Sequence, residues 1–311
     1  MQTLLSGGSA LFRRLTPLIF VIFWSTGFIV ARFIAPYAEP LTFLLLRYIG
    51  AILFLLVFAL YVGALWPRTR AQWGHAFASG ILLHAGYIGC VWWAVRLGVP
   101  ASIAALFSAI QPILTPVLAP MLLRERVGLI QWLGVLLGFA GLLLVLTPKL
   151  VGIDPGQLAA VAWPLALGAA GILSLTAGTL YQKKFVHSGD LRTVAILQYV
   201  GACVATLPAA LLFEQMHITW NLTTISAMVW SIIVLSVISV GLLLVLIRRG
   251  EVSRSSQLIY LVPPVSALQA WAFFGEDFTF IQLIGMGVTV LGVVLASRAK
   301  TSLPPKTPLP A

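Results

Sequence analysis

Long apolar runs separated by short polar connections are the feature that most constrains this chain. Ten runs reach about 20 residues, the length that a helix needs to cross the hydrocarbon core of a bilayer. Charged residues make up 9% of the sequence, against about 25% in soluble domains, so a soluble enzyme and a disordered tail are excluded. The runs are continuous rather than alternating, which excludes a β-barrel and predicts an all-α integral membrane protein. The predicted spans are residues 15–34, 41–62, 72–96, 100–122, 127–147, 157–182, 193–213, 224–247, 254–274 and 279–297.

The basic residues predict the orientation of these spans. With the N-terminus in the cytoplasm, 15 of the 19 Lys and Arg residues fall in cytoplasmic connections or tails, and only Arg32, Arg96 and Lys149 fall on the other side. This bias places both termini in the cytoplasm. The net charge of +11 is therefore a topology signal, and we expect no nucleic-acid partner. The first run lacks a clear cleavage site and is interpreted as an uncleaved span rather than a signal peptide.

An internal repeat relates the two halves at an offset of 151 residues. Tyr48 corresponds to Tyr199 and Pro112 to Pro263, and several Glu, Gln and Gly residues match at the same offset. Each repeat holds five spans, an odd number, so the second enters the membrane in the opposite direction. Inverted repeats of this kind are typical of secondary transporters, whose substrate site lies near the midplane between the halves. The predicted units are 15–147 and 157–297, with cytoplasmic tails at 1–14 and 298–311.

The repeated segment carries a family resemblance. QPILTPVLAPMLLRERVGLIQWLGVLLGFAGLLLVL is echoed by VPPVSALQAWAFFGEDFTFIQLIGMGVTVLGVVLAS, with a mid-span Pro, a Glu after the helix and a Gly-rich span. This pattern resembles the EamA-type members of the drug/metabolite transporter superfamily, over about residues 15–297. The resemblance implies a multi-pass exporter of small metabolites in the bacterial inner membrane. Within the superfamily the chain most resembles the YddG kind of member, which exports aromatic and other neutral amino acids.

The acidic residues narrow the class of substrate. All eight lie in or beside connections, and none falls at the middle of a span. A strongly cationic substrate would find no counter-charge there, so a neutral or zwitterionic metabolite such as an amino acid is favoured.

Polar and aromatic residues near mid-span are the candidate substrate contacts. An aromatic wall with hydroxyl and amide groups suits a zwitterion that carries an apolar side chain. The candidates are Trp24, His84, Tyr87, Ser108, Gln111, Trp163 and Tyr260. Each has a structural alternative: His84 can form a neutral bond between helices, Trp163 can belong to the aromatic belt, and the hydroxyls can bond neighbouring backbone.

Three prolines are candidate gating residues. A Pro inside a helix removes a backbone hydrogen bond and bends the axis. Pro112, Pro263 and Pro264 occupy related positions in the fourth and ninth spans, so we expect these spans to bend as opposite ends of the pathway open and close. A static kink that only shapes packing is the alternative.

Two further features are interpreted as structural. Glycines in the fifth and tenth spans, including Gly141, Gly287 and Gly292, predict close packing rather than a pathway wall. Arg47 lies inside a span, and we interpret it as a partner of another ion or of a backbone carbonyl, because its repeat counterpart is the neutral Gln198.

The favoured function is an exporter of small neutral or zwitterionic metabolites that works by alternating access. Export of another metabolite or drug class, a channel and an integral membrane enzyme are the alternatives. The four His residues are scattered and no metal or ATP-binding motif occurs, so we expect neither enzymatic activity nor a cofactor. Substrate identity, flux direction, proton coupling and oligomeric state stay open at this point.

Overall fold

A computed structural model gives the fold of the chain. The residues that it describes are 10–108, 110–111, 114–115, 118, 128–150, 158–186, 189–243, 262–275 and 277–298. Within them the chain is helical, and the one strand-like feature is an isolated bridge between Ala38 and Ile218. Continuous apolar sequence explains this outcome, because a helix satisfies its own backbone hydrogen bonds without water.

The described helices fall in all ten predicted spans. The first half contains α2 (Ala10–Ile34), α3 (Pro40–Tyr61), α4 (Arg70–Gly80), η1 (Ile81–Gly89), α5 (Cys90–Arg96), α6 (Ala101–Ser108) and α8 (Leu129–Leu150). The second half contains α9 (Leu158–Phe185), α10 (Leu191–Phe213), α11 (Leu222–Trp230), η3 (Ser231–Ser239), α14 (Val262–Phe274) and α15 (Phe280–Arg298). The segments η1 and η3 are wide π-type turns that continue α4 into α5 and extend α11.

Five described helical segments are long and apolar enough to cross a bilayer. They are Pro40–Tyr61, Arg70–Arg96, Ala162–Phe185, Leu191–Phe213 and Leu222–Leu243. Shorter apolar helices lie in other predicted spans, and the crossing of the membrane by all ten stays a prediction.

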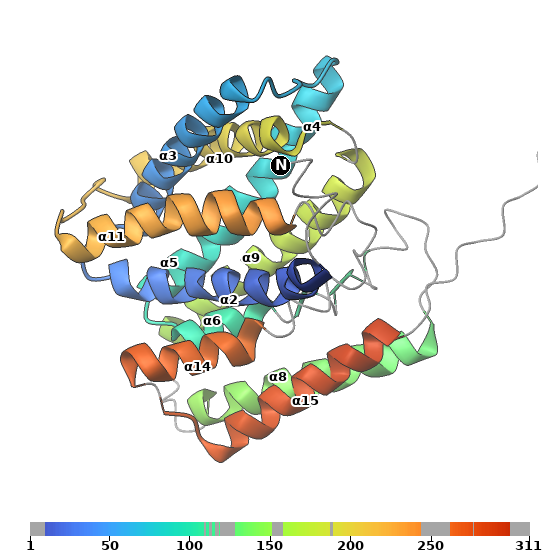
Figure 1. The fold of residues 1–311 in the computed structure, drawn as a ribbon. Coiled ribbons are helices and arrows are strands. Elements are labelled where there is room, and N and C mark those ends of the chain that lie inside the picture. Colours follow the sequence, from blue (N-terminus) through green and yellow to red (C-terminus); the bar gives the residue numbers. More distant parts are fainter. Residues whose placement is uncertain are drawn as a thin grey trace, which may run out of the picture.

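The helices α3 and α10 run beside each other at the top of Figure 1 and pack through a buried pair of tyrosines. Tyr48 of α3 and Tyr199 of α10 are fully buried, and their rings stack with centroids 5.7 Å apart. The Tyr48 hydroxyl donates to the carbonyl of His84 at 3.0 Å, and the Tyr199 hydroxyl donates to the carbonyl of Ser236 at 2.8 Å. Each tyrosine thus ties its helix to the π-type segment of its own half.

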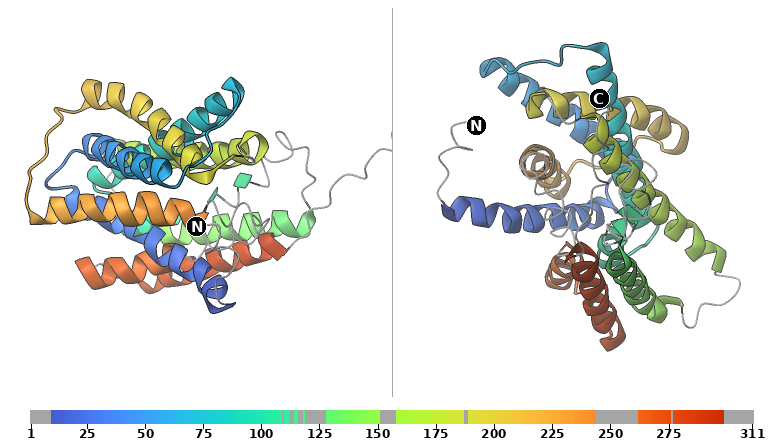
Figure 2. Two further views of the ribbon diagram at one scale, coloured as in Figure 1. Left: turned by 45° about the horizontal axis from the view of Figure 1, so that its top comes forward. Right: turned by 90° about the vertical axis from the view of Figure 1, so that its right-hand side faces the viewer.

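The helices α8 and α15 form a pair along one edge of the molecule (Figures 1 and 2). Their glycines allow the backbones to approach closely: a Cβ added to Gly292 would lie 2.3 Å from the backbone nitrogen of Gly138, and one added to Gly141 would lie 2.4 Å from that of Thr289. Gly287 differs from the expectation, because a Cβ there would meet nothing within 4 Å. It lies two residues from Gly285 and from Thr289, about half a helical turn from the contact, on the exposed side of α15.

The start of α3 is joined to the connection that follows α10 by hydrogen bonds of two carboxylates. The Glu214 carboxylate accepts hydrogen bonds from the backbone N–H groups of Leu41 and Thr42, at 2.8 and 2.7 Å. It thereby caps the N-terminus of α3, where unpaired N–H groups favour a negative charge. Nearby, the backbone N–H of His217 donates to the Glu39 carboxylate at 2.8 Å.

A second set of contacts lies at the start of α10. The Thr193 hydroxyl donates to the carbonyl of Leu65 at 2.9 Å, and the Asp190 carboxylate accepts from the backbone and side chain of Arg192. Partial burial opposes ionisation of Asp190, but its hydrogen bonds with Arg192 outweigh burial and hold its pKa below the usual value. Both sets join connections that the sequence predicts to share a side of the membrane.

Replacing Gly292 with Val should destabilise the protein through the contact between α8 and α15. The added side chain overlaps the backbone of α8, and overpacking of this kind costs about 1–3 kcal/mol. Gly287→Val is the matched control, since it makes the same change in helix propensity at a position with open space. Thermal unfolding in detergent should show a lower midpoint for Gly292→Val alone; equal midpoints for the two variants would contradict the packing.

Candidate functional site

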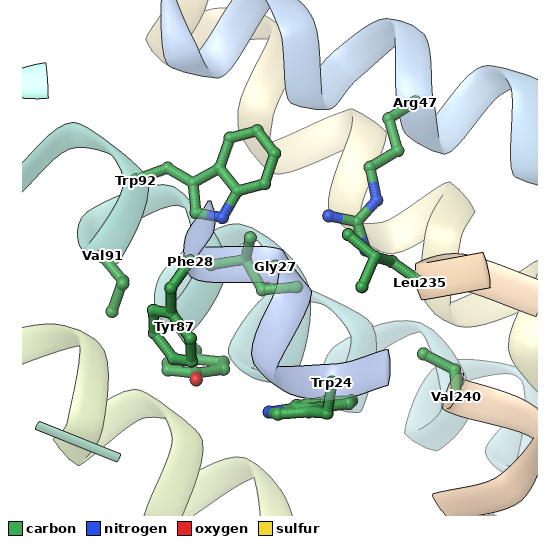
Figure 3. Close-up of a pocket in the computed structure, with 10 residues that line it drawn as sticks. Trp24, Gly27, Phe28, Arg47, Tyr87, Val91, Trp92, Leu235 and Val240 are labelled. Atoms are coloured by element: carbon green, nitrogen blue, oxygen red, sulfur yellow. The ribbon is translucent and has the colours of Figure 1, made fainter. Parts of the chain in front are cut away.

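A small, mostly apolar cavity with four aromatic side chains in its wall lies between helices of both halves of the chain (Figure 3). It has a volume of about 40 Å³, which is room for a few water molecules. An amino acid is larger, so the side chains or helices around the cavity have to move apart before one can enter. The lining residues are Trp24, Gly27 and Phe28 of α2, Arg47 of α3, Tyr87, Ile88, Val91 and Trp92 of η1 and α5, and Leu235 and Val240 of η3 and the turn after it.

The α2 helix supplies one aromatic wall. Trp24 and Phe28 are one helical turn apart, so their side chains project from the same face, and both line the cavity. The Trp24 ring packs against Phe20 at a centroid distance of 5.3 Å, which orients it. Gly27, between them, adds no side chain and keeps the wall open in front of Leu235.

Tyr87 and Ser108 are brought together as a pair. Tyr87 lines the cavity from η1, and its hydroxyl lies 2.9 Å from the Ser108 hydroxyl at the end of α6. Both side chains are buried, so this hydrogen bond satisfies groups that would otherwise be costly to desolvate. It also links η1 to the fourth predicted span beside the cavity.

Arg47 brings a guanidinium to the cavity wall. The side chain is 3% exposed, and its Nε donates to the Ser236 hydroxyl at 2.8 Å. The guanidinium carbon lies 5.7 Å from the centre of the Trp92 ring, within the range of a cation–π contact. Figure 3 shows the side chain reaching from α3 towards Leu235, opposite Trp92. The expected partner was an ion or a carbonyl; the described partners are a hydroxyl and an aromatic ring.

His84 lies outside the set of residues that line the cavity. Its ring is buried, stacks on Tyr199 at 4.6 Å, and lies 6.0 Å from Tyr48. Neither ring nitrogen has a hydrogen-bond partner among the described residues. Its role as a substrate contact stays a prediction.

The remaining candidates are dispersed. Gln111 is buried, and its amide nitrogen donates to the Thr179 hydroxyl at 3.0 Å, while its amide oxygen has no partner in the described part of the chain. Trp163 is 61% exposed on α9, on a surface that in a membrane protein faces lipid. Tyr260 lies outside the described residues.

Of the three predicted gating residues, the structure describes Pro263 and Pro264. Pro263 and Pro264 lie in the first turn of α14, and the chain before Val262 is outside the described residues, as is Pro112. The start of α14 is tied to α2, because the Ser25 hydroxyl lies 3.4 Å from the Val262 carbonyl. The bending of these spans stays a prediction.

Sequence reasoning missed three features of the site. It gave no sign of the π-type turns in η1 and η3, which often mark functional positions and whose carbonyls the two central tyrosines engage. It did not select Trp92, because its neighbours in the sequence, Val91 and Trp93, are apolar and do not distinguish it from a lipid-facing aromatic residue. It treated Arg47 as structural, although an ionisable residue inside a span is itself a signal of function.

The part of the chain that the structure describes contains no group of three His, Cys, Asp or Glu residues placed to hold a metal ion. The residues that line the cavity offer aromatic faces for an apolar or cationic group, a hydroxyl for hydrogen bonds, and one cation for an anionic group.

Comparison with known proteins decides the family. The model of the EamA-like transporter family matches residues 15–147 and again residues 162–298. The chain belongs to this family. Its apolar helices and its relatives make it a multi-pass transporter protein of the inner membrane.

The relatives named by function are transporters. Over 300 residues and 95% of both chains, the sequence is 25% identical to the uncharacterized inner membrane transporter YedA of Escherichia coli K12. It is 26% identical over 287 residues to a probable amino-acid metabolite efflux pump of Salmonella typhimurium, with 89% of this chain and 92% of that protein covered. A crystal structure at 19% identity superposes with a TM-score of 0.69, over 91% of this chain and 96% of the other, which supports the fold.

A double-mutant cycle on Tyr87→Phe and Ser108→Ala should reveal coupling between the two side chains. Each single change removes the same buried hydrogen bond, so the double variant should be more stable than additivity predicts, by about 0.5–1.5 kcal/mol. The measurement is the free energy of unfolding of the four proteins in one detergent. Simple additivity would show that the pair does not interact.

Proposed function

We propose that the protein exports small neutral or zwitterionic metabolites, with aromatic and other neutral amino acids as the leading class, and that it works by alternating access rather than as an enzyme. The observation that carries the proposal is an aromatic cavity lined by both halves of the chain. Trp24 and Tyr87 come from the first half, and Leu235 and Val240 come from the second. A site shared between two halves opens to one side or the other when the halves tilt against each other.

Paired contacts support two inverted repeats, 15–147 and 157–297, with tails at 1–14 and 298–311. Tyr48 and Tyr199 are 151 residues apart, stack on each other, and make matching bonds to the carbonyls of His84 and Ser236. The family model also matches the chain twice. Because each unit is predicted to contain five spans, the second would be inverted relative to the first, with both termini cytoplasmic.

The charges near the cavity support the substrate class. No described acidic side chain lines it, so a cation would lack a counter-charge in a medium where unpaired charge is costly. The rings of Trp24, Phe28 and Trp92 offer a surface for an apolar side chain. One relative carries the name of a probable amino-acid metabolite efflux pump, which agrees with this class.

Gating by the fourth and ninth spans is part of the proposal. Pro112, Pro263 and Pro264 would let these spans bend at related positions, each opening one end of the pathway.

Counterflow in proteoliposomes tests the transport mechanism. Vesicles loaded with unlabelled L-phenylalanine should take up labelled L-phenylalanine transiently and with saturation, because a carrier exchanges substrates across the membrane. Trp24→Ala should weaken this exchange by at least tenfold, since burying an aromatic side chain against the wall stabilises binding by about 1.5–3 kcal/mol.

The matched control is Trp271→Ala, which removes a tryptophan that is 59% exposed on α14. It should leave exchange unchanged. A linear, unsaturable flux would indicate a channel, and equal effects of the two tryptophan variants would contradict the assignment of the cavity as the binding site.

A further inference from the structure

Arg47 is a buried cation that makes a single hydrogen bond to the described residues. A guanidinium has five N–H donors and stays protonated in proteins. In the described part of the chain, Arg47 makes one hydrogen bond, from Nε to the Ser236 hydroxyl at 2.8 Å. The described residues include an ion pair between Asp190 and Arg192 but no carboxylate partner for Arg47.

A buried charge that has no counter-ion among the described residues requires an explanation. Leaving a buried cation without a counter-ion costs several kcal/mol, and a cation–π contact recovers only about 0.5–2 kcal/mol of this. Ionisable residues inside membrane spans are usually functional. The guanidinium of Arg47 lies at the cavity wall.

The repeat provides an internal comparison. Gln198 occupies the position 151 residues after Arg47, and its amide nitrogen donates to the Ser79 hydroxyl and to the Gln182 amide oxygen, both at 3.0 Å. A neutral amide therefore suffices to connect the helices at this position. Of the two residues, Arg47 lines the cavity and carries a charge, whereas Gln198 is neutral and is not among the lining residues. This difference argues against a purely structural role for Arg47.

We propose that Arg47 binds the carboxylate of the transported substrate. The inference rests on the proposed transport function and deepens it by assigning the anionic end of the substrate to one residue. The two Nη atoms can meet a carboxylate with parallel hydrogen bonds, the geometry that a guanidinium favours. Ser236 acts as a positioning residue, because its bond to Nε fixes the plane of the guanidinium.

The aromatic residues that line the cavity would contact the rest of the substrate. The rings of Trp24, Tyr87 and Trp92 contact the apolar part of the substrate, and their faces can accommodate an ammonium group. The binding site therefore selects for a carboxylate, with an aromatic or aliphatic side chain beside it. An amine or an amide that lacks the carboxylate would leave the guanidinium without a partner and bind poorly.

Four small molecules test this selectivity: L-phenylalanine, 3-phenylpropionate, L-phenylalaninamide and phenethylamine. Their binding to the purified full-length protein in detergent is measured by calorimetry. The two carboxylates should bind at least tenfold more tightly than the amide and the amine, as expected for hydrogen bonds to a charged group. Equal affinity for the acid and the amide, or no binding of either carboxylate, would overturn the inference.

Variants of Arg47 assign the effect to this residue. Arg47→Gln copies the residue found at position 198 and should reduce carboxylate affinity at least tenfold while abolishing the preference over the amide. Arg47→Lys keeps the charge without the planar fork and should retain the preference with weaker binding; it also provides the test if the Gln variant does not fold. Arg192→Gln, at the ion pair with Asp190, is the control and should bind like the wild type.

The outcomes separate this inference from the proposed function. Counterflow of L-phenylalanine that is unaffected by Arg47→Gln would overturn the role of Arg47 and leave the transporter intact. Binding of 3-phenylpropionate that depends on Arg47, without any transport of L-phenylalanine, would support the carboxylate site and overturn amino-acid export.

Discussion

Hydrogen bonds inside a hydrocarbon environment must be made within the protein, and the buried, stacked pair of Tyr48 and Tyr199 meets this constraint between α3 and α10. Each hydroxyl reaches a carbonyl in a π-type turn, at 3.0 and 2.8 Å. A π-type turn shifts the regular pairing of backbone groups, so these carbonyls benefit from an external donor. The two bonds hold η1 and η3 against α3 and α10, and this arrangement brings Tyr87 and Leu235 to the cavity from opposite halves.

The distribution of charge follows from the same constraint. Described acidic side chains lie at helix ends, where Glu214 and Asp190 find backbone N–H donors, and the interior is left to neutral groups. Arg47 is the exception, with one hydrogen bond and one aromatic contact. Its positive charge distinguishes the cavity from the rest of the described interior and gives a chemical reason for a substrate that carries a carboxylate.

Sequence reasoning predicted the helical architecture, the family, and close packing at glycines of the fifth and tenth spans, because span length, hydropathy, the repeated Pro, Glu and Gly pattern and glycine spacing carry this information. The pairing of these two helices, α8 and α15, with each other is a finding of the structure. It also selected Trp24, Tyr87 and Ser108, which the structure brings together in and beside the cavity. It could not separate Trp92, buried at the cavity, from Trp163, which is 61% exposed. Lipid and protein interior are equally apolar, so hydrophobicity does not show which face of a membrane helix is buried. The π-type turns and the surroundings of Arg47 depend on neighbours that are distant in sequence.

The central claim is that a single cavity between the two halves is exposed to each side of the membrane in turn. Labelling of Val240→Cys, in a protein whose Cys90 and Cys203 are replaced by Ala, tests this claim most directly. A membrane-impermeant maleimide should react from the outside of right-side-out vesicles and from the outside of inverted vesicles, and saturating L-phenylalanine should slow both reactions. Labelling from one side only, at a rate that the substrate does not change, would contradict alternating access to this cavity.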